Sequence, residues 1–497
     1  MHGKMRVLFA VSEVYPLIKT GGLADVGHSL PHALDRVGAD VRLVIPAYRA
    51  VLEQAESMKV IGWLTVQGAE RQHEVRILAA NAPEISVPLW LVDCASLFDR
   101  PGNPYLRADG GDWHDNAERF TVFSRVIAQL AADRLEIGWL PDVVHCNDWQ
   151  TGLVPAFLSQ QRQRPKTVFT IHNLSYGGHY GPDEFHRLHL PWRWWDVDGM
   201  EFYGGFSMLK AGIVFADEVT TVSPTYAREI CTADFGCGLQ GVLQVNRHKL
   251  HGILNGIDED VWNPETDSLL PAHYSVQRRQ PGKSINKRTL LHHFGLSCDE
   301  KSDHVPLLGM VGRLVQQKGV DLILDALPRL LGQTEACFVF VGSGQSEYEQ
   351  RLQAFADQYP RRVGVYVGYD EKLAHLVEAG ADMFLMPSRF EPCGLNQMYS
   401  LRYGTPPIVY RTGGLADTVF DVDDVHVDRK VANGFVFDEL SADGLIDAVT
   451  RAIHLFGQTR RWQTLLRTGM HQSFGWEHSA MIYLSLYQGG ALPQPNE

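Results

Sequence analysis

The hexapeptide Thr-Gly-Gly-Leu-Ala-Asp occurs twice in this chain, at residues 20–25 and 412–417. Each copy lies after an apolar, strand-like run, follows a basic residue (Lys19 or Arg411) and leads into a helical pattern. Glycines at the start of a helix leave backbone N–H groups accessible, and the helix dipole adds positive potential there. The repeat therefore predicts two halves that both offer backbone donors to an anion, with a phosphate-bearing ligand bound in a cleft that both halves face.

Length and charge limit the possible classes of protein. A chain of 497 residues is too long for one hydrophobic core, so two or three domains are expected. The net charge of −13, without any basic block, argues against nucleic acid or an anionic membrane as a partner. Any bound phosphate must be held by local bases acting against this overall field.

Cysteine usage and apolar runs point to the cytoplasm. The seven cysteines are scattered and none forms a Cys-x-x-Cys pair, as in a reducing compartment rather than a disulfide framework or zinc site. Ser12 and Glu13 interrupt the first apolar run, so it predicts a buried strand and not a signal peptide. No apolar run approaches the roughly 20 residues that span a bilayer.

Strand-like and helical segments alternate along both halves of the chain. Short apolar runs are typical of parallel strands covered on both faces, and their alternation with helices predicts a doubly wound α/β fold. Residues 60–92 contain what we interpret as several short β-rich pieces. Strands are expected at 6–11, 41–45, 142–146, 167–171, 219–222, 306–311, 337–341, 363–367, 383–386 and 407–410, and helices at 23–37, 116–133, 320–331, 347–358, 371–379, 395–403 and 476–487.

A change in composition marks the expected boundary between the halves. Residues 247–265 hold Asn-Gly and Asn-Pro turn signals and precede a polar stretch that reaches residue 301. After it the strand–helix alternation restarts. We therefore predict one domain over residues 1–249, a second over 250–470, and a final helix-bearing segment over 471–497.

Two bases lie at a strand-to-helix junction in the second half. Arg313 and Lys318 belong to the segment Gly-Arg-Leu-Val-Gln-Gln-Lys-Gly, which follows the strand at 306–311 and opens a helix. That position suits a diphosphate at the helix N-terminus. The alternative is a solvated basic turn. The segment lacks the paired glycines and Lys-Ser/Thr ending of a P-loop.

Glu391 and Cys393 follow another strand of the second half, in Arg-Phe-Glu-Pro-Cys-Gly. A carboxylate at this position can accept two sugar hydroxyls, although the helix dipole alone would also favour an acid there. Cys393 is interpreted as a packing residue, because no histidine neighbours it in sequence to make it a nucleophile.

In the first half, polar residues again follow strands. His172 and Asn173 come after the strand at 167–171, and Asp148-Trp149 supplies a carboxylate beside an aromatic face, a pair that suits sugars. The alternatives are a structural histidine and a buried turn aspartate. Asp196-Val-Asp198 could be taken for a metal-binding motif, but no strand precedes it, so a metal site is disfavoured.

Taken together, the motifs resemble the bacterial glycogen synthase and plant starch synthase family. The resemblance covers nearly the whole chain, and the motifs occur in the family's order. Its motifs here are Lys-Thr-Gly-Gly-Leu-Ala-Asp at 19–25, His-Cys-Asn-Asp-Trp at 145–149, Thr-Ile-His-Asn at 170–173, Val-Ser-Pro-Thr-Tyr at 222–226, Leu-Asn-Gly-Ile-Asp at 254–258, Gly312-Arg313 with Lys318-Gly319, Pro-Ser-Arg-Phe-Glu-Pro-Cys-Gly at 387–394 and Arg-Thr-Gly-Gly-Leu-Ala-Asp at 411–417.

The resemblance implies a GT-B fold, in which two Rossmann-like parallel-sheet domains face a deep interdomain cleft and the last helix crosses back to the first domain. It also implies transfer of glucose from ADP-glucose to the non-reducing end of an α-1,4-glucan such as glycogen, with retention of configuration and with no cofactor or essential metal. Neither nucleic acid nor membrane is an implied partner.

The resemblance also assigns roles to residues. Arg313 and Lys318 would hold the donor's phosphates, Glu391 would contact the glucose, and His172 would lie beside the anomeric carbon; these four are the candidate catalytic residues. The remaining donor-side candidates are Lys19, Gly21, Gly22, Asn255, Cys393, Gly394, Leu395, Thr412 and Gly413, and the acceptor-side candidates are Glu13, Tyr105, Asp148 and Asn173.

The chain departs from related retaining transferases at two positions. Many carry a second glutamate eight residues after the first, where this chain has Tyr399, as other synthases of this type do, so sugar recognition would rest on Glu391 alone. Asn396 stands where threonine is common. Residues 268–301 match the family poorly.

Three other functions stay open at this point. A transferase of the same fold could use UDP-glucose or make a sucrose- or trehalose-type product. A glucan phosphorylase would need a lysine-bound pyridoxal phosphate. A non-catalytic glucan-binding protein would keep aromatic surfaces but would not need Arg313, Lys318 and the two Gly-Gly loops.

Overall fold

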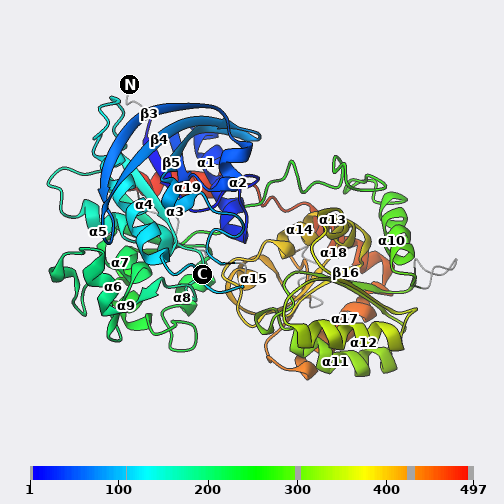
Figure 1. Cartoon of the computed structure of the whole chain (residues 1–497). Coiled ribbons are helices and arrows are strands. Elements are labelled where there is room, and N and C mark those ends of the chain that lie inside the picture. Colours follow the sequence, from blue (N-terminus) through cyan, green and yellow to red (C-terminus); the bar gives the residue numbers. More distant parts are fainter. Residues whose placement is uncertain (1–3, 108, 297–303, 423–430, 491–497) are drawn as a thin grey trace. The chain divides into compact units, whose positions relative to one another are not determined.

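The computed structural model describes residues 4–107, 109–296, 304–422 and 431–490 (Figure 1). The chain divides into two compact units, one of residues 1–256 with 476–497 and the other of residues 257–475. Helix α19 (Trp476–Tyr487) belongs to the first unit and packs against α1 (Gly22–Arg36). The chain passes from one unit to the other after residue 256 and again after residue 475. Next to these two positions, Ile257 donates its backbone N–H to the carbonyl of Phe474 (2.8 Å).

The first unit is built on a nine-stranded sheet in the order β12-β11-β7-β6-β1-β2-β5-β4-β3. From β12 to β5 neighbouring strands are parallel. Its strands are β1 (Arg6–Ala10), β2 (Asp40–Pro46), β3 (Glu56–Gln67), β4 (Gln72–Ala82), β5 (Ile85–Asp93), β6 (Val143–Asn147), β7 (Lys166–Ile171), β11 (Glu218–Thr221) and β12 (Leu250–Gly252). The doubly wound core that the sequence predicts is present here.

The prediction of several short pieces in residues 60–92 was wrong. This region holds most of β3, β4 and β5, which are 12, 11 and 9 residues long, and β3 and β4 run antiparallel to their neighbours. In β4 the buried His73, Val75 and Ile77 alternate with exposed residues. This period of two indicates a sheet edge with one solvated face, which antiparallel strands tolerate.

Eight further described helices and a small sheet complete the first unit. The helices are α2 (Arg49–Gln54), α3 (Ala95–Phe98), α4 (Asn116–Ala131), α5 (Val154–Leu158), α6 (Pro182–Arg187), α7 (Met208–Phe215), α8 (Pro224–Glu229) and α9 (Gln240–Val245). The three-stranded sheet, β8 (His179–Tyr180), β10 (Gly205–Ser207) and β9 (Glu201–Phe202), gave no clear pattern in the sequence because its strands have only two or three residues.

The second unit contains a six-stranded, fully parallel sheet in the order β15-β14-β13-β16-β17-β18. Its strands are β13 (Leu307–Val311), β14 (Cys337–Gly342), β15 (Val363–Val367), β16 (Met383–Met386), β17 (Pro407–Tyr410) and β18 (Phe435–Phe437). Its helices are α10 (Gly282–His293), α11 (Val320–Gln333), α12 (Ser346–Gln358), α13 (Glu371–Gly380), α14 (Asn396–Arg402), α15 (Gly413–Thr418), α17 (Ala442–Phe456) and α18 (Thr459–Met470).

The side chains of a central strand alternate between two hydrophobic cores, one on each face of this sheet. In β14, Phe338 and Phe340 join the cluster formed with α11, α12, α17 and α18, while Val339 and Val341 join the cluster formed with α10 and α13. Both faces are therefore apolar, which is why these strands appear in the sequence as continuous apolar runs. Helix α10 was not predicted, because its segment is polar.

Strand order reverses at one point in each sheet. In the first unit the chain runs from β1 outward through β2 and later returns to β6 on the other side of β1; in the second, β13 and β16 are the adjacent strands. Ligands of open α/β sheets bind beyond the carboxyl ends of the strands at such reversals. The loops after β1, β6, β13 and β16 are therefore the expected site positions.

Candidate functional site

The loop after β1 is organised around the buried carboxylate of Glu13. Its Oε1 accepts hydrogen bonds from the hydroxyls of Tyr105 (2.6 Å) and Thr20 (2.7 Å), and its Oε2 accepts one from the backbone N–H of Thr20. Burial raises the pKa of Glu13 above its ordinary value, and these hydrogen bonds oppose the rise. Glu13 therefore links the first hexapeptide to Tyr105, which lies 92 residues further along the chain.

The first hexapeptide presents an accessible helix N-terminus. Gly21 is the N-cap of α1 and makes no side-chain cap, and both Gly21 and Gly22 are exposed. The ammonium of Lys19 lies 2.8 Å from the carboxylate of Asp25, in the first turn of the helix. The first backbone N–H groups of a helix generally lack partners within the helix, and binding of an anion by this loop stays a prediction.

Asp148 follows β6 in a strained backbone conformation. Its φ is 59°, its side chain is buried, and its Oδ1 has no hydrogen-bond partner among the described residues. Burial raises the pKa of the Asp148 carboxyl well above its usual range, and the charge of Glu13 adds to the rise. A strained residue with an unpaired buried oxygen is a functional candidate, because both features cost free energy.

His172, directly after β7, is fixed in one tautomer. The amide nitrogen of Asn147 donates to the carbonyl of Ala10 (3.0 Å), which turns its Oδ1 toward Nε2 of His172 (2.9 Å). Nε2 therefore carries the proton, and Nδ1 is left as an acceptor. Burial lowers the pKa of His172 to about 3, so the imidazole is neutral near pH 7.

Two further predicted residues of this unit have structural contacts. Oδ1 of Asn173 accepts the backbone N–H of Ser175 (3.1 Å), which closes the turn after β7. Asn255 is buried beyond β12, where its N–H donates to the carbonyl of Val222 (3.4 Å). Their predicted ligand contacts stay predictions.

In the second unit, two of the predicted site residues form a direct ion pair. Lys318 follows β13 and Glu391 follows β16, and Nζ of Lys318 lies 2.6 Å from Oε2 of Glu391. The hydroxyl of Ser388 donates to the same oxygen (2.9 Å). The pair lies beyond adjacent strand ends at the reversal of strand order, and its side chains are only 20% and 9% exposed.

A cavity of about 150 Å³ adjoins this pair. It is lined by residues of β13 and β16, by residues that follow these strands and by the first residue of α14, namely Met310, Val311, Gly312, Lys318, Leu385, Met386, Ser388 and Asn396. Asn396 donates to the carbonyl of Val311 (2.8 Å). Arg313, exposed at the start of the same loop, donates to Oε1 of Gln317 (3.0 Å).

The second hexapeptide is used differently from the first. Gly413 and Gly414 are buried, and a Cβ on Gly413 would come within 1.9 Å of the carbonyl oxygen of Glu391. Gly413 also has a φ of 45°, and the N–H of Gly414 donates to the same carbonyl (3.1 Å). This Gly-Gly pair therefore supports the Glu391 loop by close backbone packing, a role that the repeat alone did not indicate.

The other predicted donor-side residues lie in or against that loop. Thr412 and Cys393 are buried, and Gly394 has a φ of 73°. The side-chain amide of Gln397 donates to the carbonyls of both Cys393 and Gly394 (3.0 Å each), holding the turn that leads through Leu395 into α14. Binding of the donor by these residues stays a prediction.

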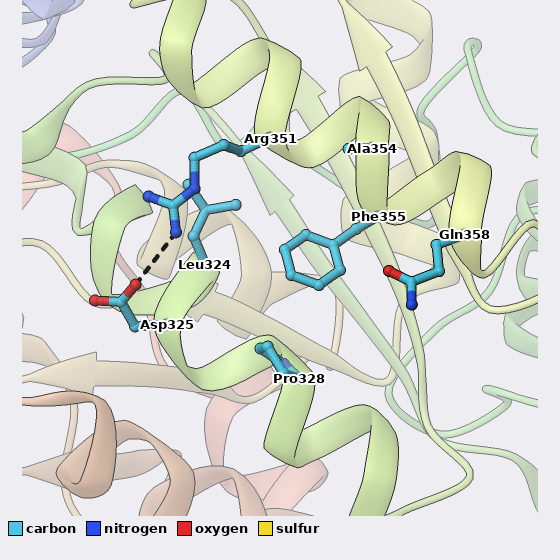
Figure 2. Close-up of a pocket in the computed structure, with 7 residues that line it drawn as sticks. All are labelled: Leu324, Asp325, Pro328, Arg351, Ala354, Phe355 and Gln358. Carbon is cyan, nitrogen blue, oxygen red and sulfur yellow. Dashed lines mark hydrogen bonds and ion pairs between the residues drawn. The ribbon is translucent and has the colours of Figure 1, made fainter.

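A larger cavity, of about 400 Å³, opens between α11 and α12 (Figure 2). Its walls are mainly apolar, and Arg351 is paired with Asp325 at 3.3 Å at one side. None of the predicted site residues lines it. It lies on the outer helices and away from the loops that follow β13 and β16.

The sequence did not single out three supporting residues, Thr20, Asn147 and Ser388. Each lies within three residues of a predicted one or inside a quoted motif, and each orients a Glu or His through a hydrogen bond. Their position as small polar residues beside a candidate catalytic group is the sequence feature that could have identified them.

The Asp196–Asp198 segment is held by Lys210, whose ammonium binds the carbonyls of Val197 and Glu201 (2.6 Å each).

Comparisons with known proteins match both units. A model of the starch synthase catalytic domain matches residues 6–245, and one of glycosyl transferases group 1 matches residues 299–464. Glycogen synthases of Hydrogenovibrio crunogenus and Thioalkalivibrio sulfidiphilus are each 52% identical to this chain, covering 97% of it and 99% of their own length. The chain belongs to the glycogen synthase family. Its members are glycosyltransferases, so the predicted family and enzyme class are confirmed.

A solved structure confirms the fold of this glycogen synthase family member. The catalytic domain of starch synthase IV from Arabidopsis thaliana, solved with ADP and acarbose, superposes with a TM-score of 0.86 at 34% identity, covering 98% of this chain and 99% of that one. The two α/β units are therefore those of the GT-B fold. Among the described residues, no helix has the length and apolar character needed to cross a membrane.

Proposed function

We propose that this glycogen synthase family member transfers glucose from ADP-glucose to the non-reducing end of an α-1,4-glucan and retains the anomeric configuration. The observation that carries the proposal is the Lys318–Glu391 pair (2.6 Å) at the strand-order reversal of the second unit. A cation for phosphate and a carboxylate for sugar hydroxyls stand side by side there, as a sugar nucleotide requires.

The bases of the second unit would act on the leaving group. Negative charge accumulates on ADP as the glycosidic bond breaks, so donors aimed at the diphosphate stabilise the transition state more than the ground state. Lys318 is held in place by Glu391, while Arg313 is exposed and, among the described residues, donates to Gln317. We therefore assign Lys318 a fixed position and Arg313 a reorientation toward the phosphates on binding.

Glu391 and His172 would recognise the sugar. Lys318 and Ser388 both contact Oε2 of Glu391, and we assign Oε1 to the glucose hydroxyls. The resemblance implies that His172 lies beside the anomeric carbon. Because its pKa is about 3 and Nε2 donates to Asn147, its neutral Nδ1 can accept a hydrogen bond from a sugar hydroxyl, but the ring holds no second proton to give to the leaving group near pH 7.

For the acceptor we assign Glu13, Tyr105, Asp148 and Asn173 of the first unit. With no carboxylate assigned to the face of C1 opposite the leaving group, we propose attack from the leaving-group face, the departing phosphate oxygen taking the proton of the acceptor hydroxyl. Trapping of a covalent glucosyl adduct on Glu391 or Asp148 would disprove this path.

We propose that no cofactor or metal ion takes part and that the enzyme works in the cytoplasm, in agreement with its scattered cysteines. Activity should then be unchanged in EDTA, and the pure protein should show no absorbance band of pyridoxal phosphate. Loss of activity in EDTA that Mg²⁺ restores would contradict the metal-free reaction.

The deciding experiment is incorporation of ¹⁴C-glucose into glycogen from ADP-glucose and, separately, from UDP-glucose. The proposal expects the higher kcat/KM with ADP-glucose. Faster transfer from UDP-glucose would reassign the donor. Binding of ADP-glucose without any incorporation would instead favour a non-catalytic protein.

A further inference from the structure

Trp262 lies between two rings in the second unit, a few residues after Ile257, where the chain enters that unit. Its ring is 3.8 Å from that of His375 at 15° and 3.8 Å from that of Tyr399 at 10°. Two rings cannot share one face of the indole at this distance, so His375 and Tyr399 cover opposite faces. The stack therefore connects the entering segment to α13, which carries His375, and to α14, which carries Tyr399.

The buried carboxylate of Asp267 braces this stack. Its Oδ2 lies 2.8 Å from Nδ1 of His375 and accepts the hydroxyl of Tyr403, at the end of α14 (2.6 Å). Burial alone would lower the pKa of His375, but the bond to Asp267 and the carboxylate of Glu371 at 3.5 Å outweigh burial and raise it. A protonated imidazole is attracted to an indole face, so this environment strengthens the contact with Trp262.

The segment by which the chain leaves the second unit is bound at the same place. Oε1 of Glu259 accepts the backbone N–H of Phe474 (2.8 Å) and lies 3.9 Å from Nε of Arg402 in α14. Both segments that connect the second unit to the rest of the chain are therefore attached to α14.

The other end of α14 belongs to the candidate donor site. Asn396, its first residue, lines the cavity beside the Lys318–Glu391 pair. The amide of Gln397 holds the carbonyls of Cys393 and Gly394, in the turn that follows Glu391. Because α14 has only seven residues, about two turns, a shift at its middle moves its first residues as well.

We propose that Trp262 is a positioning residue for the donor site: by stacking on Tyr399 it holds α14, and through α14 it sets the turn that follows Glu391. The inference rests on the proposed function, which places the donor glucose at Glu391. It also gives a role to Tyr399, whose ring stands where many related transferases carry a second glutamate. Because coupling between two sites is reciprocal, donor binding should in turn restrain residues 257–262.

The first test is the KM for ADP-glucose in full-length variants. Trp262→Leu, which keeps an apolar side chain but no flat ring, should raise this KM about 5- to 20-fold, the size expected for losing two stacked contacts, and leave the KM for glycogen unchanged. Trp262→Phe, which keeps a ring face, should raise it less than about threefold. Phe355→Leu is the matched control, because Phe355 is also a half-buried aromatic residue of the second unit, on α12, and should leave both KM values unchanged.

A double-mutant cycle tests the route through α14. If Trp262 acts by holding Tyr399, then Trp262→Leu should add little to the KM increase already produced by Tyr399→Leu. Fully additive effects would overturn the route. A wild-type KM in Trp262→Leu, or equal KM values in the leucine and phenylalanine variants of Trp262, would overturn the role of the stack.

Amide hydrogen exchange tests the same link without turnover. In the ligand-free protein, Trp262→Leu should speed exchange over residues 391–402 more than Phe355→Leu does, and saturating ADP should slow exchange over residues 257–262 in the wild type but not in Trp262→Leu. Equal exchange over residues 391–402 in the two variants would show that Trp262 only stabilises the fold. If the wild type transfers no glucose, the proposed function fails, while exchange in the ligand-free variants still decides the link.

Discussion

Replacing Lys318 with methionine is expected to reduce kcat about 10²- to 10³-fold, because it removes one fixed cation from the departing diphosphate. The side chain is only 20% exposed and its Nζ is held 2.6 Å from Glu391. A unit charge about 4 Å from a phosphate oxygen near a protein surface is worth about 4 kcal/mol, and the part gained only in the transition state is about 2.7–4 kcal/mol. Methionine keeps the length and the apolar packing of the stem.

The same substitution also removes the cation from Oε2 of the buried Glu391, which keeps the hydrogen bond from Ser388. Loss of one hydrogen bond to a charged group costs about 1.5–3 kcal/mol of folding free energy, so the melting temperature should fall as well. A second series in the Glu391→Gln background separates the two effects. There the stability cost of Lys318→Met should shrink, since no carboxylate loses its cation, while the loss in kcat should persist.

The assay is initial-rate transfer from ADP-glucose to glycogen, with thermal unfolding of each variant. Lys372→Met is the control, because Lys372 is exposed at the start of α13 in the same unit. A kcat of Lys318→Met within about threefold of the wild type would refute the phosphate role. Disappearance of the kcat loss in the Glu391→Gln background would show that Lys318 acts only by holding Glu391.

Three further predictions concern the supporting structure. Burial lowers the pKa of His145 to about 3 from an ordinary 6.5, so the unfolded chain binds the proton more tightly than the folded protein does. The free energy of unfolding should therefore fall as the pH drops from about 6.5 toward 3. Urea unfolding should show that this free energy falls less over the same pH range in His145→Gln. Tyr105→Phe removes a donor to the buried carboxylate of Glu13 and should cost about 1–3 kcal/mol of stability and raise the KM for glycogen; an unchanged melting temperature would contradict this contact. Gly413→Ala should destabilise the protein by about 1–3 kcal/mol or more and lower its activity, because the new Cβ would meet a backbone oxygen at 1.9 Å. Gly21→Ala should fold normally, because a Cβ there has no atom within 4 Å. Equal melting temperatures of the two variants would show that the two copies of the hexapeptide have the same packing role.

Continuous apolar strands were predictable from the sequence because both of their faces are buried. β16 and β17 have the bounds that were expected, and α19 does as well. β3 and β4 were misjudged, since a half-solvated edge strand alternates between apolar and polar residues and breaks the run into apparent fragments. The polar helix α10 gave no amphipathic signal and buries lysines and an asparagine as well as leucines.

For the candidate site, the sequence indicated which residues follow strand ends but not how they pair. The Lys318–Glu391 contact joins residues 73 positions apart, and the Tyr105–Glu13 contact joins residues 92 apart, so both depend on strand order. The identical hexapeptides could not reveal that Gly21 is exposed while Gly413 packs on a carbonyl oxygen, because a glycine's neighbours are set by tertiary structure.

A crystal structure of the protein grown with ADP would show directly whether Lys318 and Arg313 bind the diphosphate. We expect the diphosphate beyond the ends of β13 and β16, within hydrogen-bond distance of Nζ of Lys318 and the guanidinium of Arg313. A nucleotide bound anywhere else, with Lys318 still paired only to Glu391, would contradict it.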